Sequence, residues 1–172
     1  VATAPLAAQT TVPTPASILG YAPGADRHLP TWKQITTYFQ AVEKTSPRVQ
    51  VHVLGKTSLG RPFLAVFISD SATLKHLDRY QMIQRKLMNP LLRGKGELES
   101  LLAAGKNIIL ITSAIHSTES GGFTTPLVLT DRLARADTPE ARSMLANAMI
   151  ILVPSQNRDG VDIVGDWYRS TL

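Results

Sequence analysis

Apolar side chains recur along this chain with two periods, and the helical period comes first. Within residues 31–45 one face of a helix of 3.6 residues per turn is apolar. The residues on that face are Trp32, Ile35, Phe39 and Val42. Thr31 followed by Gln34 is typical of a capping box, and Ser46 before Pro47 disfavours further helix. We therefore predict a helix over residues 31–45.

Alternation of apolar and polar residues, the second period, follows directly. "RVQVHVLG" and "FLAVFIS" flank the turn-forming "GKTSLGRP", and together they predict a β-hairpin over residues 48–69. Two later segments, "NIILITSA" and "AMIILVPS", are continuous apolar runs. Such runs are typical of central strands that are covered on both faces.

Helical signals surround the two apolar strands. An amphipathic basic helix is predicted after the hairpin, and "ELESLLAAGK" predicts a short helix that ends at Gly105. Pro126 suits the first turn of a helix over residues 124–136, and Thr138 with Pro139 starts another that ends near Asn147. This order predicts an α/β three-layer sandwich with a mixed β-sheet, in which an antiparallel hairpin joins buried central strands.

The first 28 residues differ in composition from the rest, because they are rich in Ala, Thr and Pro and nearly uncharged. We expect residues 1–28 to be an extended segment that includes a signal-peptide remnant near Ala7 and Ala8, and residues 29–172 to form the folded domain. This favours a secreted or periplasmic protein. Cysteine is absent, which excludes disulfides and thiolate zinc sites.

The net charge of +5 raises the question of an anionic partner. The densest basic cluster comprises Lys75, Arg79, Arg85, Lys86, Arg93 and Lys95. Apolar residues at helical spacing separate these side chains, so they form the outer face of a helix. That face is either simply solvated or a patch for phosphates or an anionic surface. No aromatic stacking residues accompany it, so we predict no nucleic-acid partner. No apolar run approaches the ~20 residues of a membrane span, so we predict none.

The candidate chemistry begins in "AIHSTESGG", which follows the first apolar strand and places His116 three residues before Glu119. Open α/β sheets place ligand crevices at this end of their strands. An imidazole nitrogen and a carboxylate oxygen are both zinc ligands, at about 2.0–2.2 Å from the metal. The motif is short, however, and a histidine here can also be a hydrogen-bonded loop residue. A catalytic zinc takes three protein ligands, so this pair alone leaves both interpretations open.

A second polar segment, "VPSQNRDGVDIVGDWYR", follows the other apolar strand and leaves the sheet at the same end. Three signals occur in a fixed order: a Gly60-Arg61 turn between early strands, H-x-x-E after a strand, and N-R-D-G followed by W-Y-R. From about residue 31 to the end, this order resembles the zinc carboxypeptidase family, the carboxypeptidase A-like metallopeptidases. "HSTESGG" is similar to the first zinc loop of secreted bacterial members.

The resemblance implies a zinc-dependent peptidase that acts on peptide or protein substrates, in the first place a carboxypeptidase. It implies that His116 and Glu119 are the first two Zn²⁺ ligands. Arg169 matches the arginine that polarises the scissile carbonyl and stabilises the oxyanion.

Other positions of the family pattern are structural or altered. Asn157, Asp159 and Gly160 match residues that shape the turn before Arg169. Arg158 replaces the usual proline, which we expect to loosen this turn. There are two further departures from the family pattern. Tyr168 is an extra residue between Trp167 and Arg169, which affects the register of Arg169 relative to the family. Thr118 stands where some family members have an arginine that contacts the substrate.

The family's third zinc ligand, its carboxylate-binding Asn-Arg pair, its tyrosine and its general-base glutamate have no counterpart before Leu172. The resemblance therefore implies the N-terminal part of a truncated catalytic domain, which is inactive by itself. Two alternatives stay open: another zinc amide hydrolase of the same fold, such as a deacylase or a cell-wall peptide amidase, and a non-catalytic binding relative. The oligomeric state is not predicted.

Overall fold

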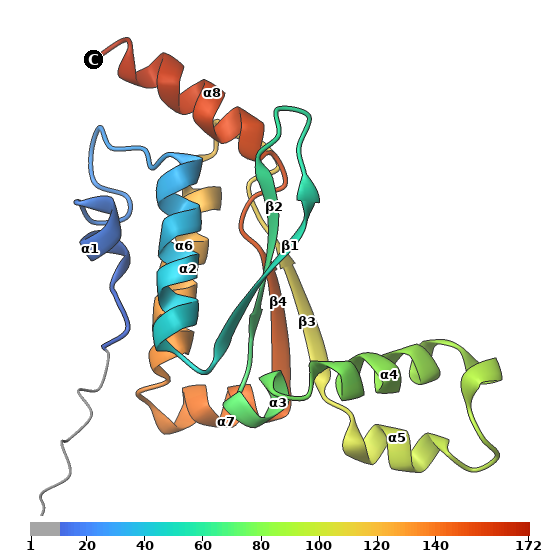
Figure 1. Cartoon of the computed structure of the whole chain (residues 1–172). Helices are drawn as coiled ribbons and strands as arrows, with labels where there is room; N and C mark the ends of the chain where they lie inside the picture. The colour runs from blue at the N-terminus through green and yellow to red at the C-terminus, as the bar shows by residue number, and fades with distance from the viewer. Residues whose placement is uncertain (1–10) are drawn as a thin grey trace, which may run out of the picture.

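A computed structural model describes residues 11–172, which form a four-stranded sheet with helices around it (Figure 1). The strands are β1 (Val49–Lys56), β2 (Pro62–Ile68), β3 (Asn107–Thr112) and β4 (Ala148–Val153). Their order in the sheet is β1-β2-β4-β3. β2 pairs antiparallel with β1 and β4, whereas β3 and β4 are parallel. The mixed α/β sheet and its antiparallel hairpin are confirmed.

The helices include every helix that the sequence predicts. They are α1 (Pro15–Leu19), α2 (Trp32–Thr45), α3 (Ser71–Leu74), α4 (Leu77–Met88), the 3₁₀ helix η1 (Pro90–Leu92), α5 (Leu98–Ala104), α6 (Ser120–Arg135), α7 (Pro139–Asn147) and α8 (Arg158–Arg169). The capping box at the start of α2 is present, with Thr31 and Gln34 each accepting a backbone hydrogen bond from the other. Among the described residues, none of these helices has both the length and the hydropathy needed to cross a bilayer.

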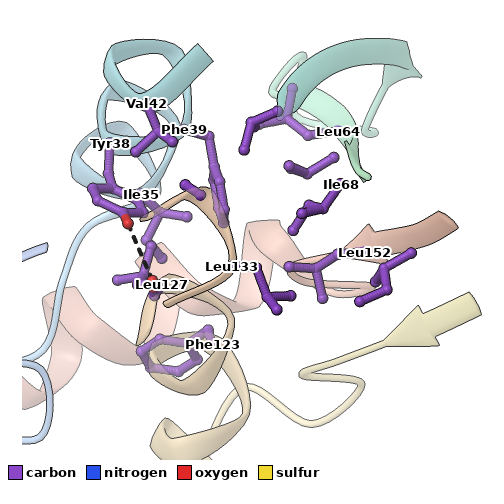
Figure 2. Close-up of a cluster of buried hydrophobic side chains, with 14 of the residues drawn as sticks. Ile35, Tyr38, Phe39, Val42, Leu64, Ile68, Phe123, Leu127, Leu133 and Leu152 are labelled. Carbon is purple, nitrogen blue, oxygen red and sulfur yellow. Dashed lines mark hydrogen bonds between the residues drawn. The ribbon is translucent and has the colours of Figure 1, made fainter. Parts of the chain in front are cut away.

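The main core lies between the sheet and the pair α2 and α6 (Figure 2). Phe39 from α2, Leu127 from α6 and Leu152 of β4 are fully buried. Leu64 of β2 is exposed by only 2%. The hydroxyl of Tyr38 donates a hydrogen bond to the backbone oxygen of Leu127 at 3.2 Å, which satisfies the one polar atom of that buried ring. α1 packs against α2 and α6.

The N-terminal segment is not extended throughout. Thr14 caps α1 by accepting from the amide of Ser17, and Gly20 ends the helix with a φ of 83°. Leu19 then joins the main core at 5% exposure. Residues 1–10, which hold the predicted signal-peptide remnant at Ala7 and Ala8, lie outside the described residues.

Two predictions about individual elements are wrong. β3 is not a central strand covered on both faces, because it lies at the edge of the sheet and exposes Leu110 by 63% and Ile109 by 41%. β4, in contrast, is buried as predicted. Pro126 is not in a first turn, because α6 begins at Ser120 and holds Pro126 in its interior. The proline there only removes the amide that would bond the carbonyl of Gly122.

Candidate metal centre

The two segments that carry the candidate chemistry lie side by side beyond the carboxyl ends of β3 and β4. Their pairing continues after the strands end, because the amide of Ser113 donates to the oxygen of Val153 at 3.0 Å. The amide of Gln156 donates to Ser113 at 2.9 Å, and that of Asn157 to Ala114 at 3.2 Å. The register of two parallel strands therefore carries over into the loops and fixes their relative position.

His116 and Glu119 project from the first of these loops toward each other. Nδ1 of His116 lies 3.3 Å from Oε1 of Glu119, and the two side chains are 69% and 63% exposed. A turn bond from the amide of Glu119 to the oxygen of His116 holds the pair together. One nitrogen and one carboxylate oxygen side by side are a donor set that zinc accepts. Within residues 11–172 no third His, Cys, Asp or Glu joins them.

A glycine lets the helix that follows begin directly against the end of β3. A Cβ added at Gly122 would lie 3.2 Å from both the Cα and the nitrogen of Ala114, closer than ordinary contact. Ala114 itself has a φ of 50°, in the left-handed region that alanine rarely adopts. The backbone is therefore bent tightly between β3 and α6, and the His116–Glu119 turn lies within this bend.

The second loop approaches the first even more closely. The hydroxyl of Ser117 donates to the oxygen of Asn157 at 3.0 Å. A Cβ at Gly160 would lie 2.1 Å from Oγ of Ser117, so only glycine fits there. Asn157 starts α8 by accepting from the amide of Gly160 at 3.1 Å. These contacts agree with the structural roles predicted for Asn157 and Gly160.

The hairpin turn is tied to the same region through carboxylates. Nε of Arg61 bonds Asp162 at 2.8 Å, and its Nη1 bonds Asp159 at 3.1 Å. The hydroxyl of Thr57 also donates to Asp159, at 2.7 Å. Burial by itself raises the pKa of Asp159, but hydrogen bonds from Thr57, the amide of Leu59 and Arg61 outweigh it and lower that pKa. The Gly-Arg turn and the N-R-D-G segment thus form one connected network.

Arg158 does not loosen the turn, in contrast to the sequence-based expectation. Its side chain is fully buried, and its guanidinium carbon lies 3.1 Å from the ring centroid of Phe63. Nη2 donates to the oxygens of Ser155 at 2.6 Å and Gln156 at 3.3 Å, whereas Nε and Nη1 have no partner within residues 11–172. Burial lowers the pKa of Arg158 to about 10. A polar position after Asn157 gives no sign in sequence that its side chain turns inward.

Arg169 lies in the last turn of α8, because the second polar segment is helical from Arg158 onward. Apolar residues at helical spacing, Val161, Val164 and Gly165 among them, turn one side of α8 inward. The guanidinium of Arg169 donates to the oxygen of Leu29 at 3.0 Å and to Asp166 at 2.7 Å. No hydrogen bond or ion pair within residues 11–172 connects it to His116 or Glu119.

A pocket of about 520 Å³ lies beside the His116–Glu119 turn. Three groups of residues line it: Thr118, Ser120, Gly121 and Thr124 around the start of α6, the α8 side chains Val164, Trp167 and Tyr168, and residues 24–29. Trp167 is 66% exposed, so its indole is available to a ligand. The sequence points to Trp167 and Tyr168, but nothing in it indicates that residues 24–29 form the opposite wall. That contact depends on Leu29 being held by Arg169 across the fold.

Comparison with known sequences identifies one family. The sequence model described as zinc carboxypeptidase matches residues 35–171, which is most of the chain. The matched range includes His116, Glu119 and Arg169. No curated protein matches this chain.

Solved structures show the same fold. Thrombin activatable fibrinolysis inhibitor superposes with a TM-score of 0.61 at 13% identity, over 91% of this chain and 33% of its own. Carboxypeptidase A from Helicoverpa armigera gives 0.57 at 19% identity, over 90% and 33%. A metallo-carboxypeptidase from Burkholderia cenocepacia gives 0.55 at 22% identity, over 77% and 28%. The chain therefore spans about a third of the length of these structures.

Proposed function

This chain belongs to the zinc carboxypeptidase family, and we propose that it provides the N-terminal part of a zinc-dependent carboxypeptidase. In this proposal the enzyme removes C-terminal residues from peptides or proteins. The observation that carries it is the position of His116 and Glu119. The two potential ligands lie 3.3 Å apart in an exposed turn at the carboxyl end of β3, inside the matched region.

The contacts around the turn suit a metal site. Catalytic rates are sensitive to ligand placement, and small displacements cost much of the rate. Here the bond from Ser117 to Asn157 and the close approach of Gly122 to Ala114 hold both ends of the turn. Among the described residues the side chains of His116 and Glu119 make no hydrogen bond or ion pair except with each other, so their donor atoms are accessible to a metal.

Each part of the chain has a distinct task in this proposal. His116 and Glu119 hold Zn²⁺, which when bound supplies a Lewis acid and lowers the pKa of water. Trp167 and Tyr168 offer aromatic surface to the side chains of the substrate in the pocket that Thr118, Ser120 and Gly121 also line. Two ligands are one fewer than a catalytic zinc takes from protein, so we expect no hydrolysis by the isolated 172-residue chain.

Zinc binding by the full-length protein tests the proposal directly. We expect one zinc per molecule after removal of metal and reconstitution, together with peptide hydrolysis that a chelator abolishes. His116→Ala and Glu119→Ala should each weaken zinc binding by at least ~100-fold. The reason is that loss of a residue that only supports a ligand already costs about 10- to 100-fold in metal affinity. His76→Ala is the matched control, because His76 is exposed and lies before α4. Unchanged zinc content in both ligand variants contradicts the proposal.

The role that the resemblance assigns to Arg169 needs a separate test. To stabilise an oxyanion, its guanidinium has to leave the oxygen of Leu29 and Asp166. Arg169→Ala should then lower kcat by about 10²–10³-fold with zinc content unchanged, as removal of one oxyanion donor does. If the arginine only holds residues 24–29 against α8, the variant loses stability and keeps its kcat.

A further inference from the structure

Helices α4 and α5, with η1 between them, project from the body of the protein as an arm (Figure 1). We call residues 77–104 the arm. It leaves the sheet at the amino end of β3, because α5 leads directly into Asn107. The His116–Glu119 turn follows the carboxyl end of the same strand. A strand of this length spans about 20 Å, so the arm and the candidate metal centre lie at opposite ends of the sheet.

The arm has an internal structure of its own. Ile83 of α4 and Leu101 of α5 are buried, at 6% and 7% exposure. Lys86 of α4 forms an ion pair with Glu97, the residue that precedes α5, and the side-chain amide of Gln84 donates to the backbone oxygen of Lys106 at 3.2 Å. The base of the arm is fixed by Lys106, which pairs with Asp70 and donates to the oxygen of Ala146 at 2.6 Å. These contacts define a structured element, not a trailing loop.

Its outer surface is apolar to an unusual degree. Six large apolar side chains of the arm are exposed by 41% or more: Met82, Met88, Leu91, Leu92, Leu98 and Leu102. The most exposed are Leu91 at 92% and Met88 at 83%, both where α4 ends and the chain turns toward α5. Several large apolar side chains exposed on one short element are typical of an interaction site.

The arm also carries excess positive charge. Its residues 77–104 contain five Lys or Arg and three Asp or Glu, and Lys75 and Lys106 flank it. Lys75, Arg79, Arg85 and Lys95 are exposed and form no ion pair within residues 11–172. Exposed leucine and methionine side chains are thus flanked by available cations.

We propose that the arm docks the protein peripherally on an anionic phospholipid surface. Met88, Leu91 and Leu92 enter the boundary between headgroups and acyl chains, and the surrounding Lys and Arg side chains contact lipid phosphates. Burial of apolar side chains combined with attraction to anionic lipid is how interfacial amphipathic elements bind. Of the three residue types enriched in protein hot spots, Trp, Tyr and Arg, the arm exposes only Arg, because it has no Trp and its one Tyr, Tyr80, is half-buried. This composition favours lipid over a protein partner.

This orientation leaves the candidate metal centre open, because the loops beyond β3 and β4 face away from the end that carries the arm. The inference does not rest on the proposed function. It follows from the exposure and charge of the arm, whatever reaction the protein catalyses.

The test is binding of the full-length protein to sedimented vesicles. One set consists of phosphatidylcholine alone, and the other contains an equal amount of phosphatidylglycerol. We expect binding only to the anionic vesicles, weakening as the salt concentration rises. Each Lys or Arg contributes about 1 kcal/mol near an anionic surface, so Arg85→Gln with Lys95→Gln should weaken binding roughly 30-fold.

Two further variants separate the arm from charge in general. Lys33→Gln with Lys44→Gln removes the same charge from the exposed side of α2, and this control should bind like the unmodified protein. The triple variant M88S/L91S/L92S should lose binding to anionic vesicles while its circular dichroism is unchanged, because all three side chains are exposed.

Several results would overturn the proposal. The first is that the protein does not bind anionic vesicles at low salt. The second is that the two charge variants lose vesicle binding equally, and the third is that the serine variant binds vesicles as well as the unmodified protein. If the unmodified protein does not bind vesicles and the serine variant has a different oligomeric state or a lower stability, the arm is covered by a second copy or by another part of the protein.

Discussion

β3 and β4 are neighbouring strands with the same apolar character and opposite surroundings. They pair in parallel over six residues each, from Asn107 with Ala148 to Thr112 with Val153. In β4 five of the six residues are buried, because β2 lies on its other side and α6 and α7 pack nearby. In β3 none is fully buried, and the side away from β4 has no partner strand among the described residues.

The difference shows that an apolar run predicts the capacity of a strand to be buried, not its burial. "NIILIT" and "AMIILV" each contain four Ile, Leu or Val residues, although β3 has a polar residue at each end, whereas all six residues of β4 are apolar. Which of them is covered depends on the neighbours that the topology supplies. An exposed apolar edge strand is a site for pairing with further chain. This agrees with a chain that spans about a third of the length of its solved structural relatives.

A matched pair of leucine substitutions tests the comparison with the largest expected effect. Leu152→Ala in β4 removes a fully buried side chain from the main core, and it should lower the free energy of unfolding by about 2–5 kcal/mol. Leu110→Ala in β3 removes a side chain that is 63% exposed, and it should change that free energy by less than about 0.5 kcal/mol. Urea unfolding of the 172-residue chain measures both.

The same pair can also break the comparison. If Leu110→Ala costs as much as Leu152→Ala in a longer protein that contains this chain, β3 is covered there by residues outside the described range. Equal costs in the 172-residue chain itself would show that the exposed face of β3 is buried in solution, for example between two copies.

Local signals were sufficient for most elements. The capping box at Thr31, the alternation in the hairpin and Thr138 with Pro139 each predict an element that the structure contains. Each signal depends on residues within a few positions of one another, so local interactions are sufficient to determine the element. The placement of both polar segments beyond the same end of the sheet could also be predicted, because β3 and β4 are parallel.

The remaining features depend on residues far apart in sequence. β3 lies at an edge because no described strand pairs with the side away from β4, and Arg158 is buried because the ring of Phe63 from the hairpin lies over it. The polar residues at the end of α8 do not reveal what they contact. Arg169 donates to the backbone oxygen of Leu29, which is 140 positions earlier in the sequence. At the candidate site the pair His116 and Glu119 could be predicted, whereas the pocket wall at residues 24–29 could not.

Two glycines extend the comparison from the strands to their loops. Gly160→Ala places a Cβ 2.1 Å from Oγ and 2.9 Å from Cβ of Ser117, so the loops have to separate. We expect a loss of about 1–3 kcal/mol in the free energy of unfolding, as for other overpacked sites. Gly121→Ala is the control, because nothing lies within 4 Å of its added Cβ and its backbone is helical. Thermal unfolding compares the two, and equal midpoints would contradict the close contact between the loops.

The attachment of the arm gives a smaller effect that depends on pH. Burial raises the pKa of Asp70, but hydrogen bonds from Lys106 and Thr73 outweigh it and bring that pKa to about 2, from 3.8. A carboxyl group with a lowered pKa stabilises the folded state above its ordinary pKa, and this stabilisation disappears as the pH falls from about 4 to about 2. The shift corresponds to about 2 kcal/mol at neutral pH.

Asp70→Asn isolates this charge, because asparagine can still accept the amide hydrogen bond of Thr73 that caps α3. The free energy of unfolding at pH 7 should fall by about 1–2 kcal/mol, and its decrease between pH 4 and pH 2 should become shallower. Asp78→Asn serves as the control, since Asp78 is exposed on α4 and forms no ion pair within residues 11–172. A variant at Asp70 with an unchanged acid profile would mean that Lys106 anchors the arm through the oxygen of Ala146 alone, and that the exposed arm is joined to the body without the help of this ion pair.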